Sequence, residues 1–504
     1  MLRSRDEAEG SEAAAVLGLT PVDWLFENAR VATLDPRRPR AQAIAVRAGR
    51  IVAIGSGSEL RSLVGARTER VDCAGATILP GLVDPHLHLF ALAARDTHLD
   101  CSSDAIRTAD ELLAAVRREA AGLPSGAWVR GEGLDEARLG RLPTAAELDR
   151  VAAAHPVRLR HRSRHASVLS SRALRFLNGP TDVRTASGLV VGREATLGRL
   201  VGPLPAAVIE KGLVSAAREL AAHGIVVVAD ATPRTRAELD PLRAVLAAGR
   251  FPLQVYVMRR VGARGWPPAG QLRSGPVKIL VEETADGLDP RPPALARLVR
   301  TAARTGNQVA VHCTGAATLV AALAAFAALP ARWRTGRRHR LEHLGECPPP
   351  LVRRIAALGL TVVTNPAFVH WRGDVYRTET PGAARRWLYR ARSLVAAGVP
   401  LAGASDAPVV PSNPWIGIAA ARTRRTAGGT VLGAAERLGA EASIRLFTTG
   451  AGFALHDDAL GRLRVGGPAH LVVVDPDPLR APPDEVANMH VRLTFVDGRR
   501  AWPT

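Results

Sequence analysis

Eight short apolar segments, separated by stretches of helical character, run in series through the middle of the chain. They cover residues 78–88, 225–230, 253–258, 277–281, 309–312, 340–343, 361–364 and 401–406. Buried runs of this kind, alternating with stretches rich in Ala, Leu and Arg, are typical of parallel strands covered by helices. Eight of them in series predict an α/β fold with a (β/α)8 barrel of the TIM type.

Both ends of the chain have a different pattern of apolar and turn-forming residues. Residues 22–77 alternate short apolar runs with turns, as half-buried antiparallel strands do, and the same pattern returns over 455–504. We therefore expect one small β-sandwich, formed by both ends, beside a barrel at 78–454. Residues 1–21 are expected to be a poorly ordered tail.

The interval between the first two barrel strands, about 102–210, is far longer than a single crossover helix. It predicts an inserted subdomain after the first strand. One helix is expected at 109–121, because Thr108 and Glu111 have the spacing of a capping box at its start.

The composition is that of a globular protein, with 47% hydrophobic and 23% charged residues. The formal net charge of +20 raises the possibility of nucleic-acid binding, but arginines are spread along the whole chain and aromatics are only 4% of residues. We expect no nucleic-acid partner and keep salt-sensitive association with nucleic acid as a minor alternative. The longest apolar run, 319–329, is too short to span a bilayer, so no membrane partner is expected.

The four cysteines, Cys73, Cys101, Cys313 and Cys347, have neither zinc-cluster spacing nor the density of a disulfide scaffold. Residues 1–18 lack the continuous apolar segment of a secretory signal. These features favour a cytoplasmic protein, and a homodimer is the default expectation for a soluble protein.

Metal-ligating side chains fall at the predicted strand ends. His86 and His88 are two apart on a strand and so share a face, while His312, His343 and Asp406 each close a predicted strand. Imidazoles and a carboxylate on one rim suit one or two divalent ions, with zinc the first choice and manganese or iron as alternatives.

Lys278 is a charged residue inside an otherwise apolar strand, and Lys211 is the only other lysine among 67 basic residues. A buried lysine can lose its proton, whereas arginine cannot. A neutral amine at this position can add carbon dioxide and become a carbamate, an anionic ligand for metal ions. The alternative is an ordinary ion pair with Glu282, Glu283 or Asp286.

The opening segment at 78–88, Ile-Leu-Pro-Gly-Leu-Val-Asp-Pro-His-Leu-His, resembles the first motif of the amidohydrolase superfamily. The resemblance extends from about Val22 to the C-terminus. It is strongest to the YtcJ-like branch, which includes N-substituted formamide deformylase. That branch is indicated by Gly131-Glu-Gly-Leu-Asp-Glu, Arg164-His-Ala, Val277-Lys, Leu341-Glu-His, Ser405-Asp-Ala-Pro-Val and Asn413-Pro-Trp.

The resemblance implies hydrolysis of a non-peptide C–N bond in a small molecule, an amide, formamide or N-acyl group, by metal-activated water. Asp406 would act as general acid and base, and Lys278 would join it in catalysis. His165 matches a substrate-contact position of the branch, although a surface histidine is an equal alternative. Trp371, Arg372 and Tyr376, expected in the loop after the seventh strand, would line the substrate pocket or serve as structural cover.

The chain departs from the branch in two places. The strand containing Lys278 is followed by Glu282-Glu-Thr-Ala-Asp-Gly, and Glu342-His is followed by Leu instead of Ala. Both differences leave substrate preference open. The rival functions are a mononuclear deaminase or a hydrolase of esters or cyclic amides on the same scaffold, and, further away, a catalytically silent barrel.

Overall fold

The computed structural model describes residues 21–102, 105–162, 166–177, 187–202, 204–284 and 286–503. Two compact units are present, one formed by the residues up to Leu92 together with those from Leu213 onward, the other by Ala93–Gly212. The tail expected at 1–21 lies outside the described residues except for Pro21. His165 also lies outside them.

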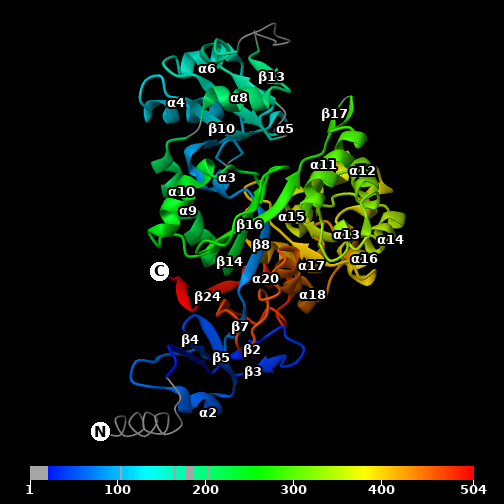
Figure 1. Cartoon of the computed structure of the whole chain (residues 1–504). Coiled ribbons are helices and arrows are strands. Elements are labelled where there is room, and N and C mark those ends of the chain that lie inside the picture. Colours follow the sequence, from blue (N-terminus) through cyan, green and yellow to red (C-terminus); the bar gives the residue numbers. More distant parts are fainter. Residues whose placement is uncertain are drawn as a thin grey trace. The chain divides into compact units, whose positions relative to one another are not determined.

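The first unit contains the barrel (Figure 1). Eight parallel strands lie in the order β22-β21-β20-β19-β16-β15-β14-β8. Their bounds are β8 Leu82–Leu87, β14 Ile225–Asp230, β15 Gln254–Arg259, β16 Leu272–Ile279, β19 Val309–Cys313, β20 Arg340–His343, β21 Thr361–Thr364 and β22 Leu401–Gly403. The predicted barrel is therefore confirmed, because the apolar segments pair in sequence order with helices between most of them.

Two backbone hydrogen bonds join the end of β8 to the segment after β22. The amide of Asp406 donates to the carbonyl of His86 at 2.9 Å, and the amide of His88 donates to the carbonyl of Ala407 at 2.7 Å. These bonds bring Asp406 beside His86 and His88.

Helices cover the outer face of the barrel, as the apolar periodicity between the strands predicts. They include α9 Ala206–Ala222, α10 Asp240–Ala247, α11 Pro292–Arg304, α12 Ala316–Ala327, α14 Pro349–Ala357, α15 Pro366–Glu379 and α17 Pro414–Thr423. Several begin with proline in the first turn, where its missing N–H has no partner to lose. In the described part of the chain, no helix has the length and hydropathy needed to cross a bilayer.

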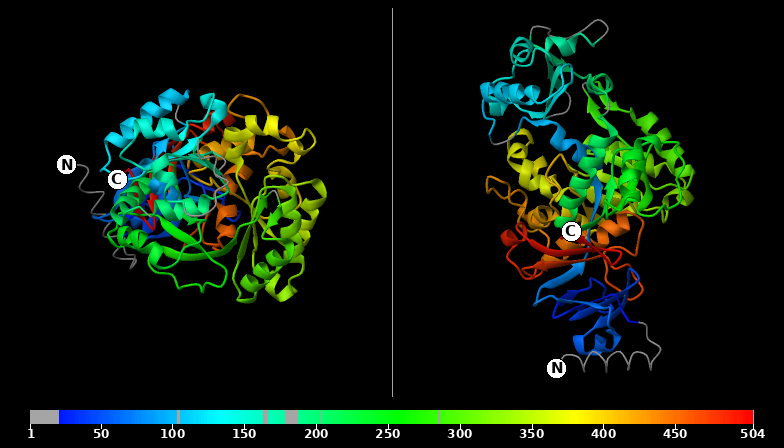
Figure 2. Two further views of the ribbon diagram at one scale, coloured as in Figure 1. Left: turned by 90° about the horizontal axis from the view of Figure 1, so that it is seen from above. Right: turned by 90° about the vertical axis from the view of Figure 1, so that its left-hand side faces the viewer.

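Strands from both chain ends form two further sheets, of order β5-β4-β1-β6 and β25-β24-β23-β7-β2-β3. Figures 1 and 2 show the blue N-terminal strands beside the red C-terminal ones. The core between the sheets draws on both ends, with Phe26 of β1 (Trp24–Glu27) edge-on to Phe495 of β24 (His490–Val496) at a centroid distance of 5.0 Å. The expected sandwich of both termini is thus present.

The single strand expected at 78–88 is two strands in the structure, which corrects the sequence prediction. β7 (Thr77–Pro80) pairs with β23 (Leu471–Asp475) in the terminal sheet, and β8 belongs to the barrel. The chain changes sheet at Gly81, where a Cβ atom would lie 2.4 Å from the Val226 side chain. Glycine fits here because nothing larger does.

The second unit is built on a sheet of order β13-β12-β11-β10-β9. Its bounds are β9 Leu99–Asp100, β10 Val129–Leu134, β11 Val157–His161, β12 Ala166–Leu169 and β13 Leu189–Val191. The helix expected at 109–121 is α4 (Ala109–Ala121), and both hydrogen bonds of its Thr108–Glu111 capping box are present. Apolar side chains of α4, β10 and β11 form the core of this unit.

Candidate metal centre

The predicted ligands lie at the carboxyl ends of the barrel strands. His86 is near the end of β8 and His88 follows it, Lys278 is near the end of β16, His312 lies on β19 and His343 ends β20. Asp406 follows β22. Parallel strands in a barrel end on one rim, so side chains from distant sequence positions converge there.

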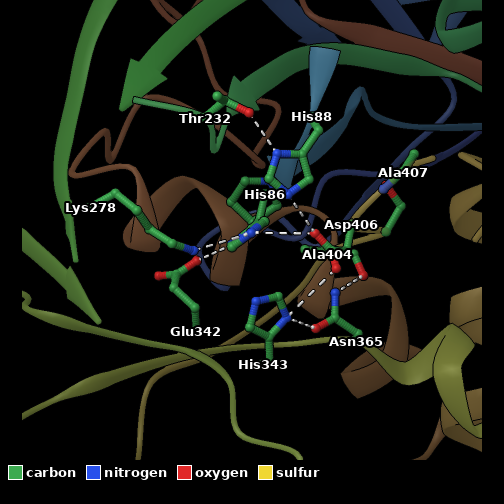
Figure 3. Close-up of polar contacts among 12 residues, drawn as sticks. His86, His88, Thr232, Lys278, Glu342, His343, Asn365, Ala404, Asp406 and Ala407 are labelled. Atoms are coloured by element: carbon green, nitrogen blue, oxygen red, sulfur yellow. Dashed lines mark hydrogen bonds and ion pairs between the residues drawn. The ribbon is translucent and has the colours of Figure 1, made fainter. Parts of the chain in front are cut away.

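Asp406 is the residue that the histidines share (Figure 3). Its Oδ1 lies 3.3 Å from His88 Nε2 and 3.5 Å from His86 Nε2, and its Oδ2 lies 4.0 Å from His343 Nδ1. His86, His343 and Asp406 each offer one ligand atom within 4.8 Å of the others. The His312 ring lies 4.5 Å from that of His343, centroid to centroid.

Hydrogen bonds orient three of the imidazoles through Nδ1. His86 Nδ1 contacts the carboxylate of Glu342, His88 Nδ1 lies 2.7 Å from Thr232 Oγ1, and His343 Nδ1 lies 2.8 Å from Asn365 Oδ1. For His86 and His88, this arrangement leaves Nε2 facing Asp406. A metal-ligating histidine is held in this way, because the bond at one ring nitrogen fixes the tautomer and the direction of the other.

Glu342 is the buried anion behind His86. Arg340 donates to it from Nε at 2.7 Å and from Nη2 at 2.8 Å, and Arg340 Nη2 also donates to the carbonyl of Pro85 at 2.9 Å. Burial would raise the pKa of Glu342, but Arg340 and His86 hold it well below its usual range. Glu342 is therefore a carboxylate that accepts a hydrogen bond from His86 Nδ1–H.

Burial sets the charge state of the other groups. It lowers the pKa of His86, His312 and His343, which favours neutral imidazoles able to bind a metal. For Asp406 burial alone would raise the pKa, but the neighbouring histidines, His343 first, bring it below its usual range. The centre thus combines neutral nitrogen donors with an ionised carboxylate.

Lys278 extends toward the same centre. Its Nζ lies 3.4 Å from His86 Nε2, and burial lowers the pKa of its amine although Glu342 and Asp406 oppose that shift. The acidic residues considered as ion-pair partners in the sequence, Glu282 among them, are exposed around the hairpin of β17 (Glu282–Thr284) and β18 (Gly287–Asp289). Among the described residues no ion pair joins Lys278 to any carboxylate.

Two residues at the rim have a backbone conformation that residues other than glycine rarely adopt. His343 has φ of 69° and Asp406 has φ of 60°, both in the left-handed region. Non-glycine residues reach this region at a cost in free energy and concentrate at functional sites. Ser405 holds the Asp406 turn in place through its Oγ–H and amide, which both donate to the buried carboxylate of Asp84.

The predicted substrate residues prove to lie on a helix, which corrects the expected loop. Trp371, Arg372 and Tyr376 belong to α15, which begins with proline two residues after β21 ends. Tyr376 Oη lies 2.9 Å from Tyr389 Oη, and the charge of Asp406 contributes to raising the pKa of both phenols, after burial itself. Trp371 instead is 43% exposed and contacts His370 edge-on.

Several supporting residues were not identified from the sequence. Glu342 was read only as part of a motif, and Arg340, Asn365, Thr232 and Asp84 were not singled out. For Arg340 and Glu342 the sequence did offer a signal, because they are opposite charges two residues apart in the short strand β20 and buried charges require partners. Asn365 and Thr232 offered none, because each contact spans more than 20 residues of sequence.

The donor set fits a divalent cation. Among the described residues no hydrogen bond reaches the buried Oδ1 of Asp406. A buried carboxylate oxygen without a hydrogen bond, facing neutral imidazole nitrogens, is an arrangement that a bound cation stabilises. Nitrogen and oxygen donors of this kind suit zinc and neighbouring transition metals.

Sequence relatives share almost the whole chain. N-substituted formamide deformylase of Arthrobacter pascens is 28% identical, over 94% of this chain and 97% of its own length. The putative amidohydrolase YtcJ of Bacillus subtilis is 26% identical, over 94% of this chain and 98% of its own. The predicted likeness to the YtcJ-like branch is confirmed by these matches.

Solved structures support the fold. An uncharacterized metal-dependent hydrolase from Pyrococcus horikoshii matches with a TM-score of 0.77 at 21% identity, over 92% of this chain and 99% of the other. A zinc-bound adenosine deaminase from Xanthomonas campestris matches with a TM-score of 0.56 at 16% identity, over 96% of this chain and 93% of the other.

The model of the Amidohydrolase family matches residues 69–501. The chain therefore belongs to the amidohydrolase family.

Proposed function

We propose that this chain is a metal-dependent hydrolase that cleaves the C–N bond of an N-formyl or N-acyl amine of low molecular mass. Family membership carries the reaction class, and the near full-length relative that acts on N-substituted formamides supports the substrate class. The observation that carries the chemistry is the convergence of His86, His88 and His343 on Asp406.

The proposed ligands are His86, His88, Lys278, His312, His343 and Asp406. Zinc is the first choice, with manganese or iron as alternatives, since all three accept imidazole and carboxylate ligands. A divalent ion bound there supplies a lowered water pKa and polarises a carbonyl oxygen. His86, His343 and Asp406 lie close enough to share one ion. Lys278 beside the ring of His86 and His312 beside the ring of His343 extend this donor set, which supports the proposal of a second ion.

Lys278 joins the donor set in this proposal as a carbamate. Its neutral Nζ attacks the carbon of carbon dioxide, so that an N–C bond forms while one C=O π bond breaks and its electron pair moves to oxygen. The nitrogen then loses one proton to solvent water or bicarbonate, which leaves an anionic carbamate with two oxygens. The support is its position, buried with Nζ beside the ring of His86, in a part of the chain where the described residues offer it no ion-pair partner.

Asp406 performs the proton transfers. Its Oδ1 faces the centre, so it accepts a proton from the attacking water and donates it to the departing amine. The Tyr376 and Tyr389 hydroxyls, which lie 2.9 Å apart, are proposed to line the acyl or amine pocket together with Arg372, which is on the same helix as Tyr376.

The test is a metal analysis combined with a substrate screen. Protein loaded with zinc or manganese in bicarbonate is analysed for metal per chain by plasma mass spectrometry, then assayed on N-formyl and N-acyl amines. We expect the parent to bind about two ions per chain and to turn over substrate. His86→Ala should bind less metal and show no turnover. The matched control is His490→Ala, an exposed histidine. Turnover retained in a clean His86→Ala preparation contradicts the proposal.

The proposal also includes a cytoplasmic location and a homodimer. The four cysteines are free and buried, which is compatible with a reducing compartment. Light scattering on the purified chain distinguishes a dimer from a monomer.

A further inference from the structure

The loop that follows β14, residues 231–234, holds the end of β8 by contacts to which the hydrolytic proposal assigns no role. The amide of Ala231 donates to the carbonyl of Leu87 at 2.7 Å. Thr232 Oγ1 lies 2.7 Å from Nδ1 of His88, the residue after β8 (Figure 3). The loop therefore contacts the backbone at the end of this strand and the imidazole that follows it.

A buried carboxylate fixes this loop at two points. Asp230, the last residue of β14, has no exposed surface. Its Oδ1 accepts from the amide of Thr232 at 3.2 Å, and its Oδ2 accepts from Arg234 Nε at 2.7 Å. The Arg234 side chain is 16% exposed. Since an unpaired charge is costly to bury, carboxylate and guanidinium hold each other in place.

Arg234 also packs against the segment that follows His88. Its guanidinium carbon lies 3.8 Å from the centroid of the Phe90 ring. Phe90 is buried and belongs to α3 (Leu89–Ala94), which begins directly after His88. A guanidinium over an aromatic face is attracted by the ring, more strongly where water is excluded. The loop therefore holds both the imidazole of His88 and the helix that begins after it.

His88 has more need of such support than its neighbours. Its side chain is 26% exposed, against 1% for His86 and 5% for His343. A buried side chain is fixed by the atoms packed around it, whereas a more exposed one retains more rotamer freedom. The direction of His88 Nε2, which lies 3.3 Å from Asp406 Oδ1, therefore depends strongly on the contact of Nδ1 with Thr232.

We propose that Arg234 is a positioning residue for the metal ligand His88. Stacked on Phe90 and hydrogen-bonded to Asp230, Arg234 fixes the loop after β14. Thr232 Oγ1 then accepts a hydrogen bond from His88 Nδ1–H, which leaves Nε2 as the nitrogen that binds the ion. This inference rests on the proposed function, because His88 is a ligand assigned there.

The experiment is a double-mutant cycle on zinc affinity, in which the zinc-loaded full-length protein is titrated with a chromophoric chelator. Thr232→Val removes the acceptor of His88 and should weaken zinc binding by about tenfold or more, whereas Thr232→Ser should bind as the parent does. Arg234→Gln should weaken binding by about fivefold. Because Arg234 acts through Thr232, adding Arg234→Gln to Thr232→Val should cause no further loss.

The matched control is Arg243→Gln, in which an exposed arginine of α10 loses its ion pair with Asp240, 3.5 Å away. It should change zinc affinity by less than about twofold. Phe90→Leu removes the ring but keeps an apolar side chain, and it should weaken binding by about two- to fivefold. This variant also tests the contact if Arg234→Gln does not fold.

Two further measurements separate positioning from packing. In the cobalt-substituted protein, the visible absorption bands report the geometry of the ligands, and they should shift in Arg234→Gln but not in Arg243→Gln. Urea unfolding of the metal-free variants measures stability alone. A purely structural role for Arg234 would lower the free energy of unfolding without moving the cobalt bands or the zinc affinity.

The outcomes distinguish this inference from the proposed function. Zinc affinity that is unchanged in Arg234→Gln and Phe90→Leu overturns the positioning role, and so do losses in Arg234→Gln and Thr232→Val that add up in the double variant. Both results leave the proposed function intact, since the parent still binds zinc. A parent chain that binds no zinc overturns the proposed function and the positioning role together.

Discussion

Glu342 fixes the position of His86, because its buried carboxylate accepts a hydrogen bond from Nδ1 of the imidazole while Arg340 donates to both of its oxygens. Arg340 and Glu342, each costly to bury alone, thus neutralise each other. His86 is held with Nε2 toward the centre, and the arginine is further held by the carbonyl of Pro85, the residue before His86. The charge network therefore ties β20 to β8.

Replacing Glu342 by Gln should damage both stability and metal binding. Arg340 would be left buried without its counter-charge, which costs about 3–5 kcal/mol in unfolding free energy. His86 would lose the anionic acceptor that orients it, which weakens metal binding by about 10–100-fold. Urea unfolding and competitive chelator titration measure the two effects. Glu69→Gln, an exposed carboxylate on β6 (Glu69–Asp72), should change neither; equal behaviour of the two variants would exclude the network.

The Lys278 carbamate has a direct spectroscopic test, because the chain has only two lysines. After incubation with zinc and ¹³C-bicarbonate, we expect one carbamate carbon resonance in the parent and in Lys211→Ala. The resonance should be absent from Lys278→Ala, which should also bind fewer ions and depend no longer on bicarbonate. A single ion in both the parent and Lys278→Ala would make the lysine structural and favour the mononuclear deaminase alternative.

The features predicted from sequence are those that depend on local pattern. The barrel followed from the count of apolar segments, and the rim positions of His86, His343 and Asp406 followed from their places at strand ends. The helix α4 followed from its capping box. In each case the signal is local: the apolar run of a strand, the residue at its end, or the Thr108–Glu111 pair.

Other features depend on contacts that no local pattern reveals. Gly81, where the run divides into two strands, lies against the side chain of Val226, far along the chain, and the continuous apolar run concealed the division. Trp371, Arg372 and Tyr376 were expected in the loop after the seventh strand, although Pro366 begins a helix there. Thr232 and Asn365, the partners of His88 and His343, lie just after other strands of the barrel and are equally invisible in the sequence.

Ser405→Ala should loosen the turn that presents Asp406. The hydroxyl donates to Asp84 and accepts from the amide of Ala407 at 3.0 Å, so its removal leaves two buried polar groups short of a partner. We expect a loss of about 1–3 kcal/mol in unfolding free energy and a lower kcat, because Asp406 needs this support at positive φ. Ser58→Ala, on the exposed helix α2 (Gly57–Leu60), is the control. An unchanged kcat with lowered stability would show that the turn needs no such support.

The tyrosine pair should affect substrate binding more than the exposed tryptophan. Tyr376→Phe removes the hydrogen bond between the two hydroxyls, and a substrate that contacts this pair should show a KM raised about fivefold or more, the effect of one neutral hydrogen bond. Trp371→Ala should leave KM within about twofold, because its side chain is largely in solvent. Steady-state kinetics on the best substrate of the screen measures both KM values. A larger rise in KM for Trp371→Ala than for Tyr376→Phe would place the pocket over Trp371.

Asp406→Asn separates proton transfer from metal binding. Asparagine keeps the size of the side chain and an oxygen donor, but it cannot accept and return a proton, so kcat should fall by about 10²–10⁴. The metal content should fall less than in His86→Ala, because the imidazoles and Lys278 remain. Asp484→Asn, an exposed residue of α20 (Pro483–Val486), controls for the loss of one charge. If kcat falls only in proportion to bound metal, Asp406 is a ligand alone and the proton must move through another group at the rim.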